Sequence, residues 1–248
     1  MTDPIAEEKR AMSRLKVSVW RGAEAGEYRS YEVPRQESQT VLDVVTFIQR
    51  YLDPTLAYRF ACRVGMCGSC GMSVNGIARW TCRTHVTRVV NGDTLEIAPL
   101  RNLPVIKDLV TDMSGFFDKW AAAKGQFRSN RSRKDEFALV SPATPERRRA
   151  DAGIECIGCG VCYSACDVVA DNPAYLGPAA LNRAWTLVND VRDGANPERL
   201  RAVAGDAGCN ACHTHVSCSE LCPKQIAPTG SIAGLKRAVS LALLKGLL

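Results

Sequence analysis

The chain has 248 residues, of which 46% are hydrophobic and 23% charged, and its formal net charge is +6. This composition is ordinary for one or two folded domains and excludes an intrinsically disordered chain. Residues 1–10 lack the apolar core of a secretory signal, and no apolar run approaches the roughly 20 residues that span a bilayer. We therefore expect a chain that stays in a reducing cytoplasm and does not itself cross the membrane.

Twelve cysteines are the most informative feature of the composition. In a reducing compartment long-lived disulfides are disfavoured, and clustered cysteines more often hold metal. Structural zinc sites usually pair two C-x2-C knuckles into a self-contained set of four. The cysteines here follow unequal spacings, so the sequence favours iron-sulfur clusters over zinc.

The N-terminal part begins with a predicted hairpin and a helix. Residues 14–20 and 27–33 alternate apolar and polar side chains around a glycine-containing turn, which is typical of antiparallel strands. Thr40 is the expected N-cap of a helix over residues 41–52, where apolar residues recur at helical spacing. The predicted order is therefore strand, strand, helix.

A glycine-rich loop over residues 58–71 follows, and its cysteines have the C-x4-C-x2-C spacing of plant-type [2Fe-2S] ferredoxins. Asn75-Gly76 favours a type I′ turn, so residues 72–83 predict a second hairpin. Its return strand would bring one more cysteine back to the loop. The predicted [2Fe-2S] ligands are Cys62, Cys67, Cys70 and Cys82.

Residues 94–98 predict a further strand, and residues 109–123 predict a helix with one broad apolar face, which is typical of core packing. Eight basic residues against three acidic ones then lie within residues 124–149. A solvated connecting segment is the simplest interpretation, and an acidic protein or anionic lipid headgroups are the alternatives. We expect no nucleic-acid partner, because there is no aromatic platform and no recognised motif.

Prolines at positions 142 and 145 place the domain boundary between about residues 126 and 145. Beyond it, residues 178–190 and 197–204 each begin with a proline, which the first helical turn tolerates. Residues 227–248 predict a final amphipathic helix. The C-terminal part is therefore expected to consist of helices joined by cluster-binding loops.

The run over residues 156–166 has the spacing C-x2-C-x2-C-x3-C, which in two-cluster ferredoxins gives three thiolates to one cluster and the fourth to another. Counting back from Cys222-Pro223 by the same spacing, the ligand positions are 218, 215 and 212. Positions 218 and 212 are cysteine, but position 215 is His215. If the last cysteine of each motif binds the cluster of the other motif, one cluster receives four thiolates, which is a full [4Fe-4S] set. Its ligands are Cys156, Cys159, Cys162 and Cys222.

The second crossed set holds only the thiolates of Cys166, Cys212 and Cys218. A cubane that lacks one cysteine ligand can lose that iron and persist as [3Fe-4S], which is the predicted cluster. His215 is an alternative ligand, because imidazole replaces cysteine in Rieske centres. Cys209 is another, although it lies three residues outside the spacing.

Together these motifs resemble those of the iron-sulfur subunit of succinate dehydrogenase and fumarate reductase. Residues 58–76 resemble its [2Fe-2S] signature and residues 104–110 its inter-domain segment, and further matches occur at Asn172-Pro173, at residues 177–180 and at residues 218–224. The resemblance implies an α+β chain. A plant-type, β-grasp-like [2Fe-2S] domain over residues 1–125 would be followed by a basic linker over 126–145. An all-α, bacterial-ferredoxin-like domain with two cubane-type clusters would occupy residues 146–248.

The resemblance also implies a function. A subunit of this kind passes electrons through [2Fe-2S], [4Fe-4S] and [3Fe-4S] clusters, between an FAD-bearing flavoprotein and quinone at a transmembrane anchor, with or without haem. Substrate chemistry would lie on the partner, so this chain would hold no catalytic residue. It would sit peripherally on the cytoplasmic face of a prokaryotic inner membrane.

In the family, residues around Cys166 and Cys212 border the quinone site, which implies quinone-proximal roles for Asp167, Asp171 and His213. Asp167 stands where the family usually has proline, and Asp171 lies where many ubiquinone-using members carry tryptophan. These departures favour menaquinone or an altered quinone site. The alternative is a freestanding multi-cluster carrier or a subunit of another quinone-linked oxidoreductase, because the chain has no flavin fingerprint or nucleotide loop.

Overall fold

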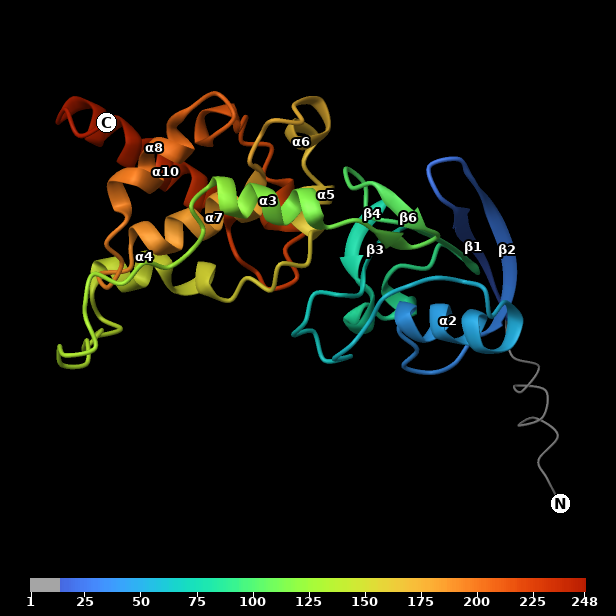
Figure 1. The fold of residues 1–248 in the computed structure, drawn as a ribbon. Helices are drawn as coiled ribbons and strands as arrows, with labels where there is room; N and C mark the ends of the chain where they lie inside the picture. The colour runs from blue at the N-terminus through green and yellow to red at the C-terminus, as the bar shows by residue number, and fades with distance from the viewer. Residues whose placement is uncertain (1–13) are drawn as a thin grey trace, which may run out of the picture. The chain divides into compact units, whose positions relative to one another are not determined.

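The structure is a computed structural model that describes residues 14–248, so residues 1–10 discussed above lie outside the described part. Contacts divide the chain into two compact units, the first ending at Asp112 and the second spanning Met113–Leu248 (Figure 1). An N-terminal unit with a sheet and a C-terminal unit of helices confirm the predicted α+β class. The first unit ends before residue 125, where the sequence had placed the end of the first domain.

The first unit is built on a five-stranded sheet in the order β2-β1-β5-β3-β4. Strands β1 and β5 are parallel and the other neighbours are antiparallel, so the two predicted hairpins and the strand over residues 94–98 are confirmed. The strands are β1 (Arg14–Gly22), β2 (Gly26–Pro34), β3 (Gly71–Val74), β4 (Ile77–Trp80) and β5 (Thr94–Ala98).

The helix α2 (Val41–Phe47) supplies several of the apolar side chains that pack against this sheet. Thr40 caps it as predicted, because its hydroxyl accepts from the Asp43 N–H while the Asp43 carboxylate accepts from the Thr40 N–H. The helix continues into a π-helical turn, η1 (Ile48–Leu52). The buried stripe of α2 therefore closes the core beneath β1 and β5.

The predicted position of Cys82 on the return strand of the second hairpin is wrong. Strand β4 ends at Trp80, and Cys82 lies in the 3-10 turn η2 (Thr81–Arg83). The Thr81 N–H and hydroxyl both donate to the Cys70 carbonyl, at 3.0 and 2.9 Å. These bonds bend the chain out of the ladder toward the cysteine loop.

The predicted helix over residues 109–123 begins later than expected. A small hairpin of β6 (Val105–Lys107) and β7 (Val110–Thr111) precedes it, and α3 covers only Ser114–Ala122. Asp108 turns this hairpin with φ of 52°, and its buried carboxylate accepts the N–H groups of Gly22 and Ala57 at 2.8 Å each. Leu109 consequently joins the core of the first unit rather than a helix face.

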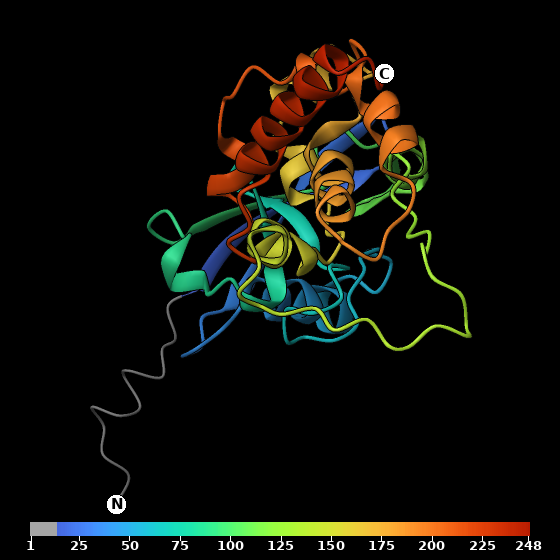
Figure 2. The same ribbon diagram turned by 90° about the vertical axis from the view of Figure 1, so that its left-hand side faces the viewer.

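The second unit is helical, with α7 (Gly177–Val188) buried at its centre and in contact with α10 (Pro228–Leu244), α4 (Pro145–Ile154) and α8 (Asn196–Ala204). Figures 1 and 2 show α10 running beside α7 and α8. The sequence predicted α7, α8 and α10, but not α4. It also missed the short helices α5 (Val161–Ser164), α6 (Asp167–Asp171) and α9 (Ser217–Glu220).

A buried ion pair ties the start of the predicted basic linker to this unit. The side chains of Arg199 and Asp193 are both 0% exposed and form two hydrogen bonds, at 2.8 and 3.0 Å. Arg199 also donates to the carbonyls of Lys124 and Gln126 at 3.0 Å. The buried charges are therefore paired and hydrogen-bonded, as such charges must be.

Within residues 14–248, none of the helices combines the length and the apolar character needed to cross a membrane.

Candidate metal centres

Four cysteines of the first unit converge as the spacing predicted, although by way of a turn rather than a strand. Cys70 and Cys82 are buried together beside Leu42 and Trp80, whereas Cys62 and Cys67 are half-buried. The Cys62 Sγ accepts from the N–H groups of Met66 and Cys67 at 3.2 and 3.3 Å. The loop therefore turns backbone donors toward its own thiols, as a loop that wraps an anionic cluster must.

The thiols of this loop differ strongly in acidity. Burial, together with the neighbouring Cys70 and Cys62, raises the pKa of Cys82 to about 12. Burial also acts to raise the pKa of Cys67, but hydrogen bonds from Ser69 and from the Cys62 N–H outweigh it and lower that pKa to about 6. A metal centre would hold all four as thiolates, because a coordinating thiol is deprotonated outright.

One arginine of this loop, Arg63, already has partners. Arg63 forms an ion pair with Asp43 at 2.6 Å, and its side chain is 46% exposed. Its guanidinium also lies 5.6 Å from the centre of the Phe60 ring. Part of the positive charge beside Cys62 is therefore neutralised, so the electrostatic effect of Arg63 on this site is small.

The second set, Cys156, Cys159, Cys162 and Cys222, lines one pocket of the second unit together with Ile157, Pro223 and Ile226. Burial raises the pKa of Cys159 to about 12, with Cys156 and Cys222 adding to the shift. Burial likewise raises the pKa of Cys162. The structure thus brings Cys222 to the thiols of the distant run, as the crossed spacing predicted.

The third set, Cys166, Cys212 and Cys218, lines a different pocket. Burial raises the pKa of Cys166, and Cys218 and Cys212 raise it further. Cys218 also contributes to the raised pKa of Cys162, so the second and third sets are neighbours. At both places buried thiols lie close together, and a metal centre bound there would hold them as thiolates.

Of the two candidate extra ligands, His215 is at the pocket and Cys209 is not. His215 lines the pocket of the third set, but its imidazole is 54% exposed and its Nδ1 lies 3.7 Å from the Asp167 carboxylate. Cys209 is fully buried, with its Sγ 3.9 Å from the Asn210 side-chain oxygen. Among the described residues that line the third pocket, Cys209 is absent.

The three predicted quinone-proximal residues lie around one open pocket of about 450 Å³ beside the third set. Asp167 and Asp171 reach it from the two ends of α6, and His213 reaches it from the loop after η4 (Cys209–Ala211). The His213 and His215 rings are 6.2 Å apart. Asp206 also lines this pocket, and the sequence had not indicated it.

Two residues with hydroxyl groups beside the third set were also not predicted from the sequence. Thr229, in the first turn of α10, has its Oγ1 3.3 Å from the Cys218 Sγ. Tyr175, just before α7, lines the same pocket as Cys166, Cys212 and Cys218. Neither residue belongs to a cysteine motif, so no local pattern in the sequence could have indicated them.

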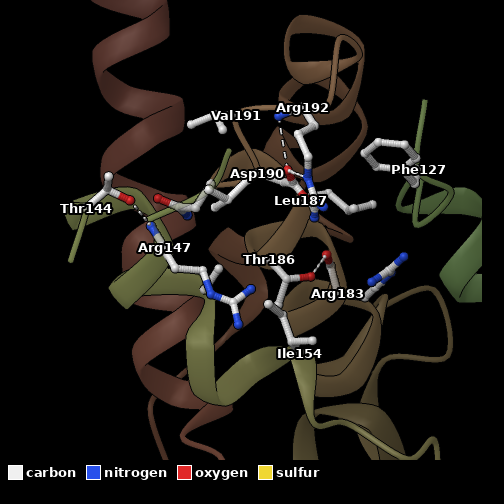
Figure 3. Close-up of a pocket in the computed structure, with 13 residues that line it drawn as sticks. Phe127, Thr144, Arg147, Ile154, Arg183, Thr186, Leu187, Asp190, Val191 and Arg192 are labelled. Carbon is white, nitrogen blue, oxygen red and sulfur yellow. Dashed lines mark hydrogen bonds and ion pairs between the residues drawn. The ribbon is translucent and has the colours of Figure 1, made fainter. Parts of the chain in front are cut away.

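A separate cleft of the second unit, of about 240 Å³, is lined by three arginines rather than cysteines (Figure 3). Arg192 forms two hydrogen bonds with Asp190, at 2.8 and 2.7 Å, and Arg147 pairs with Asp151 at 2.9 Å. Arg183 donates to the Gly125 carbonyl at 3.0 Å. These arginines have internal partners, which supports a structural rather than a ligand-binding interpretation.

Two families match this chain, one over each unit. Residues 14–118 match the 2Fe-2S iron-sulfur cluster binding domain. Residues 153–226 match the 4Fe-4S dicluster domain. The two ranges contain the three cysteine sets described above.

Relatives extend the match over most of the chain. A fumarate reductase iron-sulfur subunit of Mycobacterium tuberculosis is 36% identical, over 89% of each chain. One of Escherichia coli O6:H1 is 35% identical, over 82% of each chain. A chain in the structure of the Mycobacterium smegmatis Sdh1 complex in the apo form superposes with a TM-score of 0.83 at 28% identity, covering 92% of this chain and 96% of that one.

Proposed function

The chain belongs to the family of iron-sulfur subunits of succinate dehydrogenase and fumarate reductase, and from this premise we propose the path that electrons take through it. It is an oxidoreductase subunit with an electron-transfer role, and it carries a 2Fe-2S domain and a 4Fe-4S dicluster domain. The proposal concerns the individual ligands, the third cluster and the two ends of the path.

We assign one cluster to each cysteine set. Cys62, Cys67, Cys70 and Cys82 hold a [2Fe-2S] cluster. A [4Fe-4S] cluster is held by Cys156, Cys159, Cys162 and Cys222, and a [3Fe-4S] cluster by Cys166, Cys212 and Cys218. Each cluster supplies one-electron transfer when bound. The observation that carries this assignment is the convergence of the last two sets from segments far apart in the sequence.

The surroundings of His215 support [3Fe-4S] at the third site. The position that would supply a fourth ligand carries an imidazole that is more than half exposed and paired with Asp167. Cys209, the other alternative, is packed away from the pocket. Three thiolates therefore remain for this cluster, and a cubane with three cysteine ligands can persist without its fourth iron.

At one end of the path we place an FAD-bearing flavoprotein subunit, which carries the succinate or fumarate chemistry. At the other end we place membrane quinone, held beside Asp167, Asp171 and His213 at a transmembrane anchor, with or without haem. The support is that these three side chains share one open pocket next to the third cysteine set. Two of the three are carboxylates, which differs from the family pattern and favours menaquinone or an altered quinone site.

The chain would then lie peripherally on the cytoplasmic face of a prokaryotic inner membrane, held there by its partners. In this arrangement its own residues have two tasks. They bind the clusters, and they keep the thiolates buried away from water.

The deciding experiment is purification of the intact complex from membranes, followed by assays of succinate-driven quinone reduction and of fumarate reduction. Co-purification of a flavoprotein and small membrane subunits, with electron paramagnetic resonance (EPR) signals of three clusters, is the expected result. Quinone extraction from the same preparation identifies the electron carrier, and strict dependence on ubiquinone would contradict the menaquinone inference. A cluster-bearing chain that purifies alone and shows neither activity would support a freestanding carrier instead.

A further inference from the structure

Tyr175 holds a buried polar group that the fold alone does not satisfy. Its side chain is 0% exposed, and among the described residues its hydroxyl has no partner with hydrogen-bond geometry. A buried hydroxyl that makes no hydrogen bond destabilises the fold, because it has lost its hydrogen bonds to water. Such a group in a folded protein calls for an explanation, and an absent ion or cofactor is one of the recognised ones.

The surroundings of Tyr175 point to the third cysteine set. Two backbone hydrogen bonds fix the position of Tyr175. Its own N–H donates to the Asn172 carbonyl at 3.0 Å, and the N–H of Leu176 donates to the Ala207 carbonyl at 2.8 Å. Its side chain lines the same pocket as Cys166, Cys212 and Cys218. Its hydroxyl faces the Cys212 thiol but makes no hydrogen bond to it.

We propose that the Tyr175 hydroxyl donates a hydrogen bond to the Cys212 thiolate when the cluster of Cys166, Cys212 and Cys218 is bound, and so raises the reduction potential of that cluster. This inference rests on the proposed third cluster. It assigns a positioning and tuning role to a residue outside every cysteine motif.

The direction of the effect follows from charge. A hydrogen bond to a ligand sulfur withdraws electron density and favours the more negative, reduced state of a cluster. In its absence the reduced state is less stable and the potential falls. This site lies next to the pocket proposed for quinone. Tyr175 would therefore help to set the reduction potential of the cluster that passes electrons to quinone.

The substitution Tyr175→Phe tests this, because it keeps the buried ring and removes only the hydroxyl. We expect a potentiometric EPR titration of the intact complex to show the reduction equilibrium of the third cluster about tenfold less favourable, which is about 59 mV for a one-electron couple. The matched control is Tyr58→Phe, which removes a hydroxyl that bonds to Thr46 at 3.3 Å in the first unit. It should leave the third cluster unchanged.

Proton electron-nuclear double resonance provides a second measurement. A strongly coupled proton in the wild-type cluster that is missing in Tyr175→Phe would support the hydrogen bond directly. A third cluster whose potential and proton couplings are the same in both proteins would overturn the inference and leave the three-cluster proposal standing. No third-cluster signal in the wild-type complex would overturn both.

Discussion

The first and third cysteine sets are assembled in opposite ways. The first lies within residues 62–82, and two thiols of its loop accept hydrogen bonds from backbone N–H groups of the same loop. The third draws Cys166, Cys212 and Cys218 from separate segments, and the nearby hydroxyls come from Tyr175 and Thr229. The local site therefore depends on the path of its backbone, and the dispersed site depends on how helices pack.

This difference predicts how each site fails. A change that strains the loop should remove the [2Fe-2S] cluster alone. A change that loosens the helical unit should remove both of the other clusters and spare the first. The following substitutions, from the largest expected effect to the smallest, test this contrast.

Arg199→Ala should have the largest effect, because it leaves Asp193 buried without its partner. Breaking a buried pair in this way costs about 3–5 kcal/mol, so we expect loss of the EPR signals of both helical-unit clusters and retention of the [2Fe-2S] signal. Arg192→Ala is the control, since its pair with Asp190 has an arginine side chain that is 44% exposed. Surface pairs contribute only about 0–1 kcal/mol. Equal loss of all three signals in Arg199→Ala would contradict the contrast.

Gly65→Ala should remove the [2Fe-2S] cluster alone. Gly65 has φ of +76°, and a Cβ there would lie 2.5 Å from the Trp80 ring. The control is Gly76→Ala, at φ +77° with open space around it, which carries only the left-handed penalty of about 1–2 kcal/mol. Iron content and the EPR spectrum of the reduced protein measure the result. If the two variants lose the cluster equally, backbone strain rather than the Trp80 contact is responsible.

His215→Cys should convert one cluster rather than remove it. It supplies a thiolate at the position where the ferredoxin spacing has its missing ligand, so we expect the oxidised [3Fe-4S] EPR signal to give way to a [4Fe-4S] spectrum. His215→Ala, which adds no ligand, should keep the [3Fe-4S] signal. A [4Fe-4S] spectrum in place of this signal in the wild-type protein would show that His215 or another group already binds a fourth iron.

Arg63→Gln should give the smallest effect, a lower potential of the [2Fe-2S] cluster. Loss of a positive charge disfavours the reduced state, but Arg63 is paired with Asp43 and partly exposed. We therefore expect a shift below about 59 mV, which is tenfold for a one-electron couple. The control Arg88→Gln changes an exposed arginine of the same unit. Equal potentials in Arg63→Gln and wild type would remove any tuning role for Arg63.

Much of the fold follows from local patterns in the sequence. Alternation in residues 14–20 and the Asn75-Gly76 turn specified strands correctly, because the side-chain period of a strand is a local property. The apolar stripe over residues 109–123 gave a wrong start for the predicted helix, because Leu109 belongs to the first unit and Phe116 to the second. A helical period cannot show that the residues it connects belong to different cores.

The cysteine sets were predictable to a similar degree. Spacing alone predicted three sets of thiols, because cluster geometry restricts the loops that can bind it, and the second and third sets each line one pocket. Tyr175, Thr229 and Asp206 could not be found in this way, since only tertiary packing brings them to the third site. The helix α4 was missed because its interior is rich in charge, and it is held mainly by contacts with α7.

The crossing of the two cysteine motifs also has a consequence for biogenesis. Chains are synthesised from the N-terminus and fold domain by domain as they emerge. The proposed [2Fe-2S] ligands are complete once Cys82 has left the ribosome, whereas both sites proposed to begin at residues 156–166 await Cys212, Cys218 and Cys222. During translation, the four cysteines of residues 156–166 are exposed to oxidants and foreign metals before the other three have been synthesised. With these proposed ligands, we expect iron delivery to the helical unit to follow translation, whereas insertion into the N-terminal unit need not wait for it.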